Sequence, residues 1–99
     1  TADFLIRNTS EVLTCAGAAP RIGRLQADAG SKAGAVVAAR DGAIVFVGDE
    51  AAWNRDGHLI DGATVLDARG GAVVPGFVDP HTHAIFAGDR RDELRRRLA

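Results

Sequence analysis

Two apolar runs that flank an Asp-Gly pair form the clearest local pattern in the chain. The runs are Ala35–Arg40 and Ala43–Gly48, both rich in alanine and valine, and Asp41-Gly42 separates them. The favoured two-residue turn of a hairpin requires positive φ at both central residues, and Asp-Gly is one of the pairs that meets this requirement. The pattern therefore predicts a β-hairpin with its turn at Asp41-Gly42.

Shorter apolar runs before and after the hairpin predict further strands. Phe4–Arg7 and Glu11–Thr14 lie on either side of Asn8–Ser10, whose polar side chains favour turns. Ala63–Asp67 is a third apolar run, and a turn is expected after it at Gly70-Gly71. The chain thus carries several short strands separated by turns.

The stretches between these strands give weaker signals. Residues 16–34 are rich in alanine and glycine without a sustained period, which predicts a long surface loop with one weak strand near Arg24–Gln26. Asp49–Asn54 predicts a helical turn opened by an acidic cap, with Trp53 packed over the hairpin. Cys15 ends an apolar run and is expected to be a small buried residue.

Many short strands and little helix predict a mainly β fold, either a small antiparallel β-sandwich or a partly open barrel. The 99 residues allow one small domain at most.

With 12 basic and 13 acidic side chains, the composition gives no electrostatic footprint for nucleic acid or an anionic membrane. A single cysteine excludes an internal disulfide, and neither an apolar stretch of about 20 residues nor a signal pattern is present. A cytoplasmic protein is therefore expected.

The segment Pro75–His83, with the sequence PGFVDPHTH, carries the strongest chemical signal. Residues two apart on an extended backbone share a face, so the imidazoles of His81 and His83 can reach one metal ion. Neutral imidazole is a ligand for zinc, iron, copper and nickel, and a metal with open positions can activate water. A solvated pair is the alternative for an isolated H-x-H. The buried-strand pattern of Val73–Asp79 before the pair favours the metal site.

Other polar side chains are expected to support this site or to lie outside it. Asp79 precedes His81 by two residues, but Pro80 marks a bend, so a hydrogen bond that supports the motif is favoured over metal ligation. His58 lies in a polar loop and is assigned no ligand role. No residue of the chain is assigned as a catalytic base.

The motif and its continuation resemble a known family. PGFVDPHTH resembles the end of the first barrel strand in the amidohydrolase superfamily of metal-dependent (β/α)₈ hydrolases, and Ala84–Leu94 resembles the following stretch of the imidazolonepropionase family. The resemblance implies that residues 1–70 are the N-terminal part of an accessory β-sandwich. Residues 71–99 would then be the first strand, the metal-binding loop and the start of the first helix of an incomplete barrel. A complete barrel needs about 250 residues, so an N-terminal portion of an enzyme is expected.

The same resemblance implies the chemistry. His81 and His83 match two of the four ligands of one zinc or iron ion. Arg90 matches an arginine whose guanidinium is suited to bind the carboxylate tail of the substrate, and a solvated residue at the start of a helix is the competing interpretation. The implied reaction is the hydrolysis of 4-imidazolone-5-propanoate to N-formimidoyl-L-glutamate in histidine degradation. Arg91 and Arg95–Arg97 are expected to be surface charges.

The expected partners are a small-molecule substrate with a carboxylate tail and either further copies of the chain, as a homo-oligomer, or the remainder of the enzyme. Two histidines alone hold a metal incompletely, so the chain by itself is expected to be inactive. Two alternatives stay open. One is another cyclic-amide amidohydrolase or a deaminase, which shares the H-x-H. The other is a non-catalytic, self-associating β-module in which the H-x-H is vestigial.

Overall fold

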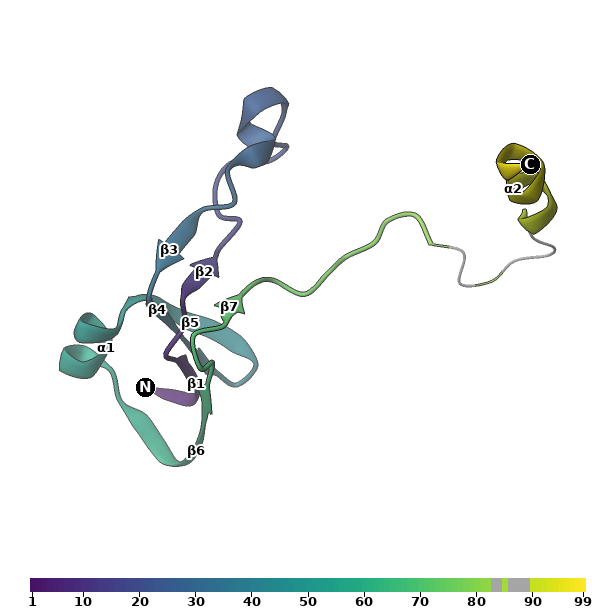
Figure 1. Ribbon diagram of the computed structural model, residues 1–99. Helices are drawn as coiled ribbons and strands as arrows, with labels where there is room; N and C mark the ends of the chain where they lie inside the picture. Colours follow the sequence, from purple (N-terminus) through teal and green to yellow (C-terminus); the bar gives the residue numbers. More distant parts are fainter. Residues whose placement is uncertain (83–84, 86–89) are drawn as a thin grey trace.

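The computed structural model describes residues 1–82, 85 and 90–99 of the chain (Figure 1). In chain order the elements are β1 (Ala2–Arg7), β2 (Glu11–Leu13), the 3₁₀ helix η1 (Gly23–Ala27), β3 (Ser31–Ala33), β4 (Ala35–Arg40), β5 (Ala43–Asp49), α1 (Glu50–Asp56), β6 (Leu59–Asp67), β7 (Ala72–Val73) and α2 (Arg91–Leu98). One sheet has the strand order β5-β4-β1-β6, and a second has the order β3-β2-β7. The mainly β fold class predicted from the sequence is confirmed.

The predicted hairpin is present. Strands β4 and β5 pair antiparallel, with Arg40 opposite Ala43 across the turn. Asp41 has a φ of 51° and Gly42 a φ of 80°, so both turn residues lie in the left-handed region that this turn requires. Strand β4 is also paired with β1 on its other side, and Ala35–Ala38 are buried. Within the hairpin, β4 therefore lies inside the larger sheet and β5 forms one of its edges.

We expect the hairpin to protect its amides from exchange with solvent. Val36–Ala39 and Ile44–Val47 should exchange slowly in the 99-residue chain, because the turn sets the register locally and β4 is paired on both sides. Hydrogen exchange followed by NMR measures this, with the exposed segment Gly23–Ala27 as the fast-exchanging control. Fast exchange throughout both strands would contradict the strand pairing.

The two sheets are joined at a corner where three strands change direction. β1 continues into β2 after Asn8, β3 into β4 at Gly34, and β6 into β7 after Gly70. Each of these residues has a positive φ, of 56° at Asn8, 58° at Gly34 and 78° at Gly70. Strands that bend from one sheet into another are a known way of making such a corner. Because the strands keep their neighbours across it, the sheet β3-β2-β7 continues β4-β1-β6.

Hydrogen bonds hold this corner together. The Gly34 N–H donates to the Ser10 carbonyl at 2.9 Å, and the Ser10 N–H donates to the Gly71 carbonyl at 3.0 Å. Thr9 is buried, and its hydroxyl donates to the Ala35 carbonyl at 2.5 Å. The Thr9 side chain thus provides a hydrogen-bond donor for the Ala35 carbonyl near the bend, where the regular hydrogen bonding between strands is interrupted.

Strand directions are mixed rather than antiparallel throughout. β1 pairs parallel with β6, and β2 pairs parallel with β7, whereas β1–β4, β4–β5 and β2–β3 are antiparallel. The antiparallel sandwich predicted from the sequence is therefore wrong in strand direction. Apolar runs identify strands, but the partner of β1 depends on how the chain returns after α1, and no local residue pattern fixes that return.

Apolar side chains gather on both faces of the larger sheet. The cluster on the face toward α1 consists of Ala2, Leu5, Val36, Ala38 and Trp53. The Trp53 ring lies 5.5 Å from the Phe46 ring of β5, so the packing of Trp53 over the hairpin is confirmed. On the opposite face, Val12, Ala35 and Val37 form a second cluster that joins the two sheets.

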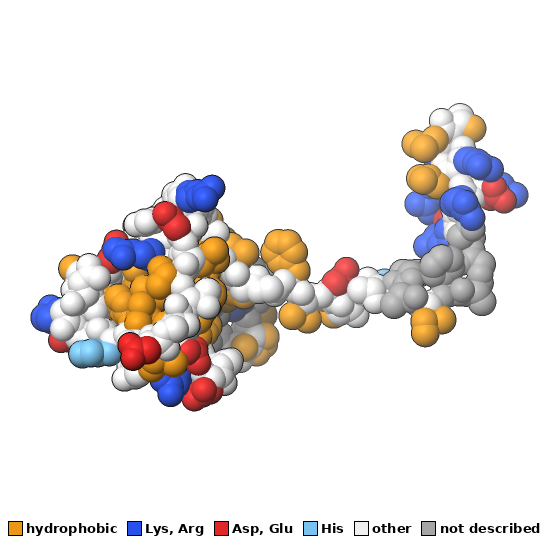
Figure 2. All heavy atoms as spheres, turned by 90° about the horizontal axis from the view of Figure 1, so that it is seen from below, with side chains coloured by type: hydrophobic (Ala, Val, Ile, Leu, Met, Phe, Trp, Pro, Cys, Tyr) orange, Lys and Arg blue, Asp and Glu red, His pale blue; other side chains and the backbone are white. Residues whose placement is uncertain are grey.

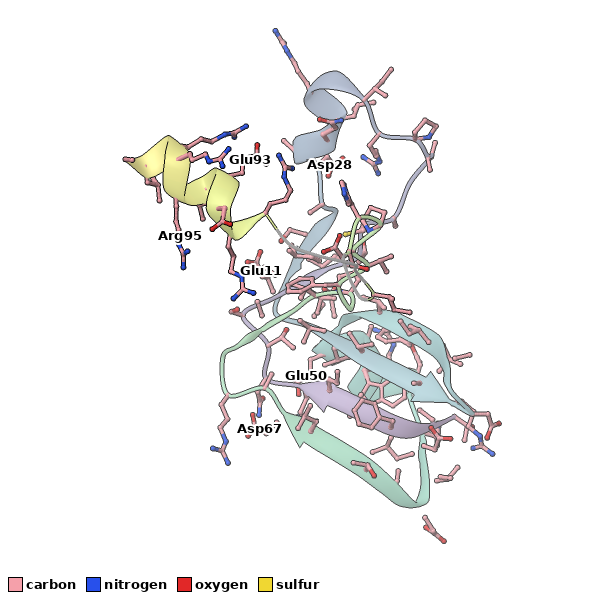
Figure 3. All side chains as sticks on the ribbon, turned by 90° about the vertical axis from the view of Figure 1, so that its right-hand side faces the viewer. Glu11, Asp28, Glu50, Asp67, Glu93 and Arg95 are labelled. Atoms are coloured by element: carbon pink, nitrogen blue, oxygen red, sulfur yellow. The ribbon has the colours of Figure 1, made fainter. Side chains whose placement is uncertain are left out.

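Helix α1 is tied to the sheet at its first residue. It begins after Asp49, as expected, but the Asp49 side chain makes no capping hydrogen bond. Glu50, which is labelled in Figure 3, lies in the first turn and forms an ion pair with Arg7 of β1. A carboxylate at this position also interacts favourably with the positive end of the helix dipole. The acidic residue expected at the start of the helix is therefore present as Asp49 at the N-cap, although it makes no side-chain hydrogen bond there.

The stretch 16–34 contains more structure than the sequence predicted. Gly23–Ala27 is a 3₁₀ helix, so the weak strand expected near Arg24–Gln26 is wrong. Ser31–Ala33 forms β3 against β2, and it was missed because all three residues are exposed and show no apolar alternation. Cys15 is exposed instead of buried, because the chain turns away from β2 there with a φ of 50°.

Candidate metal-binding segment

The segment that carries the histidine motif leaves the sheets after β7. That strand covers Ala72–Val73 only, so the buried strand predicted across Val73–Asp79 is shorter than expected. Beyond it, residues 74–82 run away from the two sheets as an extended arm (Figure 1, Figure 2). Phe77 is 97% exposed and Val78 is 90% exposed. The predicted burial is therefore wrong for this chain, because no strand pairs with residues 74–78 in the part that the structure describes.

Asp79 makes a hydrogen bond within the motif. Its Oδ1 atom accepts from the backbone N–H of His81 at 3.0 Å. An aspartate that accepts from the N–H two residues later forms an Asx turn, a local substitute for a backbone turn. The supporting hydrogen bond predicted for Asp79 is confirmed, and it crosses Pro80 at the bend that the sequence indicated.

The described residues hold only part of a metal site. His81 is exposed, and His83 lies outside the described residues. Within residues 1–82, 85 and 90–99, no group of three or more histidine, cysteine or acidic side chains is placed to hold a metal ion. His58 is exposed, and its Nδ1 atom lies 3.3 Å from the Asp56 carbonyl oxygen, in the polar loop where the sequence placed it. The assignment of His81 and His83 as metal ligands stays a prediction.

The chemistry of the donor set nevertheless fits a zinc or iron ion. Imidazole nitrogen is a common ligand of both metals. A catalytic zinc site normally has three protein ligands and one open position, so two imidazoles are too few to complete it. The remaining ligands would have to come from residues other than this pair.

Arg90 lies immediately before α2 and is paired with Glu93. Its Nε atom donates to Glu93 Oε2 at 2.6 Å, and its Nη2 atom donates to Glu93 Oε1 at 2.7 Å. This hydrogen bonding raises the pKa of the Arg90 guanidinium above its ordinary value, so the side chain keeps its positive charge. The Arg90 side chain is 76% exposed. The arginine therefore already holds a carboxylate in a two-pronged contact at the surface.

The charges of α2 form a network of short-range ion pairs. Arg97 donates to Glu93 at 3.0 Å, and Arg95 donates to Asp92 at 3.3 Å. No residue of α2 is buried, and Figure 3 shows Glu93 and Arg95 on a helix that stands apart from the strands. The surface positions predicted for the arginines of this helix are confirmed. The pairing of Arg90 with Glu93 was missed, although the spacing of three residues signals it.

An open hollow of about 390 Å³ lies on the surface at the start of α2. Its lining consists of Arg90, Arg91, Glu93, Leu94 and Arg97. Three of these side chains are cations, so the hollow presents positive charge.

Among the described residues, no helix has the length and apolar content needed to cross a membrane.

Comparison with known proteins gives a consistent set of relatives. No protein-family model matches the chain. The imidazolonepropionase of Symbiobacterium thermophilum is 50% identical over 96 residues, which are 97% of this chain and 22% of that protein. The imidazolonepropionase of Myxococcus xanthus is 49% identical over 92 residues, 93% of this chain and 21% of that protein. That of Porphyromonas gingivalis is 39% identical over 101 residues, 100% of this chain and 23% of that protein.

Comparison with solved structures gives a weaker likeness. A crystallised protein from Bacillus thuringiensis has a TM-score of 0.46 and 19% sequence identity, over 85% of this chain and 92% of that chain. A likeness at this level carries no argument about fold or function.

Taken with the H-x-H that follows PGFVDP, these relatives define the chain as part of an amidohydrolase. Within that class, the chain belongs to the imidazolonepropionases as an N-terminal portion. It spans about a fifth of the length of the curated relatives that it matches, 22% of the first of them.

Proposed function

We propose that the complete protein opens the ring of 4-imidazolone-5-propanoate by hydrolysis and releases N-formimidoyl-L-glutamate, a step of histidine degradation. The observation that carries the proposal is the 50% identity to an imidazolonepropionase across 97% of the chain. The bond that breaks is a C–N bond of a cyclic, amide-like ring. The activity belongs to the complete protein, because the chain covers 22% of that relative.

His81 and His83 are proposed to hold one zinc or iron ion. When bound, the metal lowers the pKa of a water molecule and polarises the carbonyl group that the water attacks. The two imidazoles bind the metal as neutral ligands and so must be deprotonated. We assign no general base among these 99 residues, so this chain contributes binding and positioning of the ion.

Residues 1–70 are proposed to belong to the accessory β-sandwich, and residues 71–99 to the first strand, metal loop and first helix of the catalytic barrel. The end of strand pairing at Val73 supports a division in this region. The exposure of Phe77 also supports the assignment of residues 71–99 to the barrel. A large apolar side chain in a barrel strand is buried by the neighbouring strands and helices, and those neighbours are not among the residues that the structure describes.

Arg90 is proposed to bind the propanoate tail of the substrate. Its guanidinium presents parallel N–H donors that match a carboxylate. Glu93 occupies two of these donors in this chain, at 2.6 Å and 2.7 Å, and its carboxylate has the same chemistry as the substrate tail. Binding of the tail therefore requires Arg90 to exchange Glu93 for the substrate or to share its remaining donors between them.

Arg90→Ala in the complete protein is expected to keep the metal and to raise KM about ten- to a hundredfold. The reason is that a lost charge-assisted, bidentate contact costs about 1.5–3 kcal/mol. Steady-state kinetics together with metal analysis measures both quantities. Arg91→Ala is the matched control and should be close to wild type. A damaging Arg91→Ala beside a silent Arg90→Ala would show that the wrong arginine has been assigned.

The reaction itself is tested by a substrate panel on the purified, metal-loaded complete protein. We expect turnover of 4-imidazolone-5-propanoate and none of dihydroorotate or guanine. A preference for either of the latter would replace the proposal with another cyclic-amide hydrolase or with a deaminase. No turnover of any of the three, with a defined oligomer in solution, would favour the non-catalytic β-module.

A further inference from the structure

Asp79 is fixed to the backbone of the residue that the motif presents to a metal. Its Oδ1 atom accepts from the His81 N–H at 3.0 Å, and Pro80 stands between them. Proline fixes its own φ near about −65° and restricts the residue before it to extended conformations. It also has no N–H to compete for the carboxylate. The three residues therefore form a short, stiff unit that ends at His81.

The length of the Asp79 side chain suits this contact. An aspartate or asparagine oxygen reaches the N–H two residues later, which is why these two residues dominate Asx turns. Glutamate has one more methylene group and carries the same charge, but it does not close the same ring. The hydrogen bond depends on an acceptor atom at a given reach and not on the charge itself.

We propose that Asp79 is a positioning residue for the metal site, which sets the backbone of His81 through this hydrogen bond and does not itself bind the ion. The inference rests on the proposed role of His81 as a metal ligand. A metal site loses affinity when its ligands are not held in place before the ion arrives, because ordering them then costs free energy on binding. Asp79 would reduce that cost at the point where the chain turns toward the histidine pair.

Three substitutions in the complete protein separate this role from the alternatives. Asp79→Asn keeps an acceptor oxygen at the right distance from the His81 N–H and removes the negative charge. Asp79→Glu keeps the charge and moves the acceptor oxygen away from that position. Asp79→Ala removes both the acceptor and the charge. The readout is zinc affinity, measured by competition with a chromogenic chelator, and circular dichroism checks the fold of each variant. We expect Asp79→Asn to bind zinc within about twofold of wild type. Asp79→Glu and Asp79→Ala should bind about three- to tenfold more weakly, the effect of one lost hydrogen bond.

The opposite order would overturn the inference. If Asp79→Asn weakens zinc binding as much as Asp79→Ala while Asp79→Glu does not, the carboxylate acts through its charge or as a ligand. Equal zinc affinity in all three variants and wild type would show that the hydrogen bond has no role in the site. If Asp79→Ala does not fold, the comparison of Asp79→Asn with Asp79→Glu decides alone. None of these readouts depends on the substrate, so failure of the proposed reaction would be seen separately, in a zinc-loaded wild type that leaves the imidazolone ring intact.

Discussion

Replacement of either motif histidine in the complete protein, as His81→Ala or His83→Ala, is expected to remove the bound metal and the hydrolytic activity together. The physical reason is that a catalytic metal with about three protein ligands does not hold its geometry when one is lost. A bound metal supplies several kcal/mol of transition-state stabilisation. Each 1.36 kcal/mol corresponds to about tenfold in rate, so the activity should fall by about a thousandfold or more.

Metal analysis and kinetics on the same preparations measure this prediction. His58→Ala is the matched control, since that imidazole is exposed in a polar loop beside the Asp56 carbonyl. It should keep both metal and activity. Full metal occupancy in His81→Ala and His83→Ala would mean that the H-x-H pair is not the ligand pair of the site.

Trp53→Ala is expected to cause the largest loss of stability in the 99-residue chain, about 3–5 kcal/mol. Trp53 is 8% exposed and belongs to the buried cluster that fixes α1 on the larger sheet. Removal of the indole leaves a cavity beside Phe46 that the two-layer core cannot fill. Chemical denaturation followed by circular dichroism measures the change. Phe77→Ala is the control, and it should be within about 0.5 kcal/mol of wild type because its ring is 97% exposed.

Gly57 provides an independent check on the position of the indole. A Cβ atom built on Gly57 would lie 2.3 Å from Cδ2 of Trp53. The Gly57 backbone has a φ of −83°, so the conflict is with the ring and not with the backbone. Gly57→Ala should therefore destabilise the chain by about 1–3 kcal/mol, and it should be nearly neutral when Trp53→Ala is already present. Equal costs in both backgrounds would place the indole elsewhere.

Local chemistry made the centre of the fold predictable. The hairpin follows from Asp41-Gly42, because the turn type depends on two adjacent residues whose φ values are both positive. The position of Trp53 followed from a short helix that returns over the same hairpin. In both cases the residues that make the contact are close in sequence, so the local residue pattern is enough to predict the contact.

Contacts between distant segments were not predictable in the same way. Strand β3 consists of three exposed residues, and its strand state depends on pairing with β2, where the Ser31 hydroxyl donates to Glu11 at 2.7 Å. The parallel pairing of β1 with β6 depends on a long connection through β4, β5 and α1. Neither feature leaves a periodic signal in the residues that form it.

For the candidate site, the sequence predicts a pair of metal ligands, and the described residues do not bring together a set that could hold an ion. The spacing of His81 and His83 and the hydrogen bond of Asp79 were both accessible from the sequence, because they involve residues two apart. The expected burial of Phe77 was wrong, because burial depends on neighbouring strands that the described chain does not provide. The pairing of Arg90 with Glu93 could have been predicted from the sequence, since residues three apart are neighbours on the surface of a helix.

We propose that this chain supplies part, and only part, of a metal site that opens an imidazolone ring. The most direct test compares the complete protein with the 99-residue chain, both metal-loaded and rigorously purified, for hydrolysis of 4-imidazolone-5-propanoate. We expect turnover by the complete protein and no turnover above background by the 99-residue chain. Equal turnover by the two, or none by the complete protein with its metal bound, would contradict the claim.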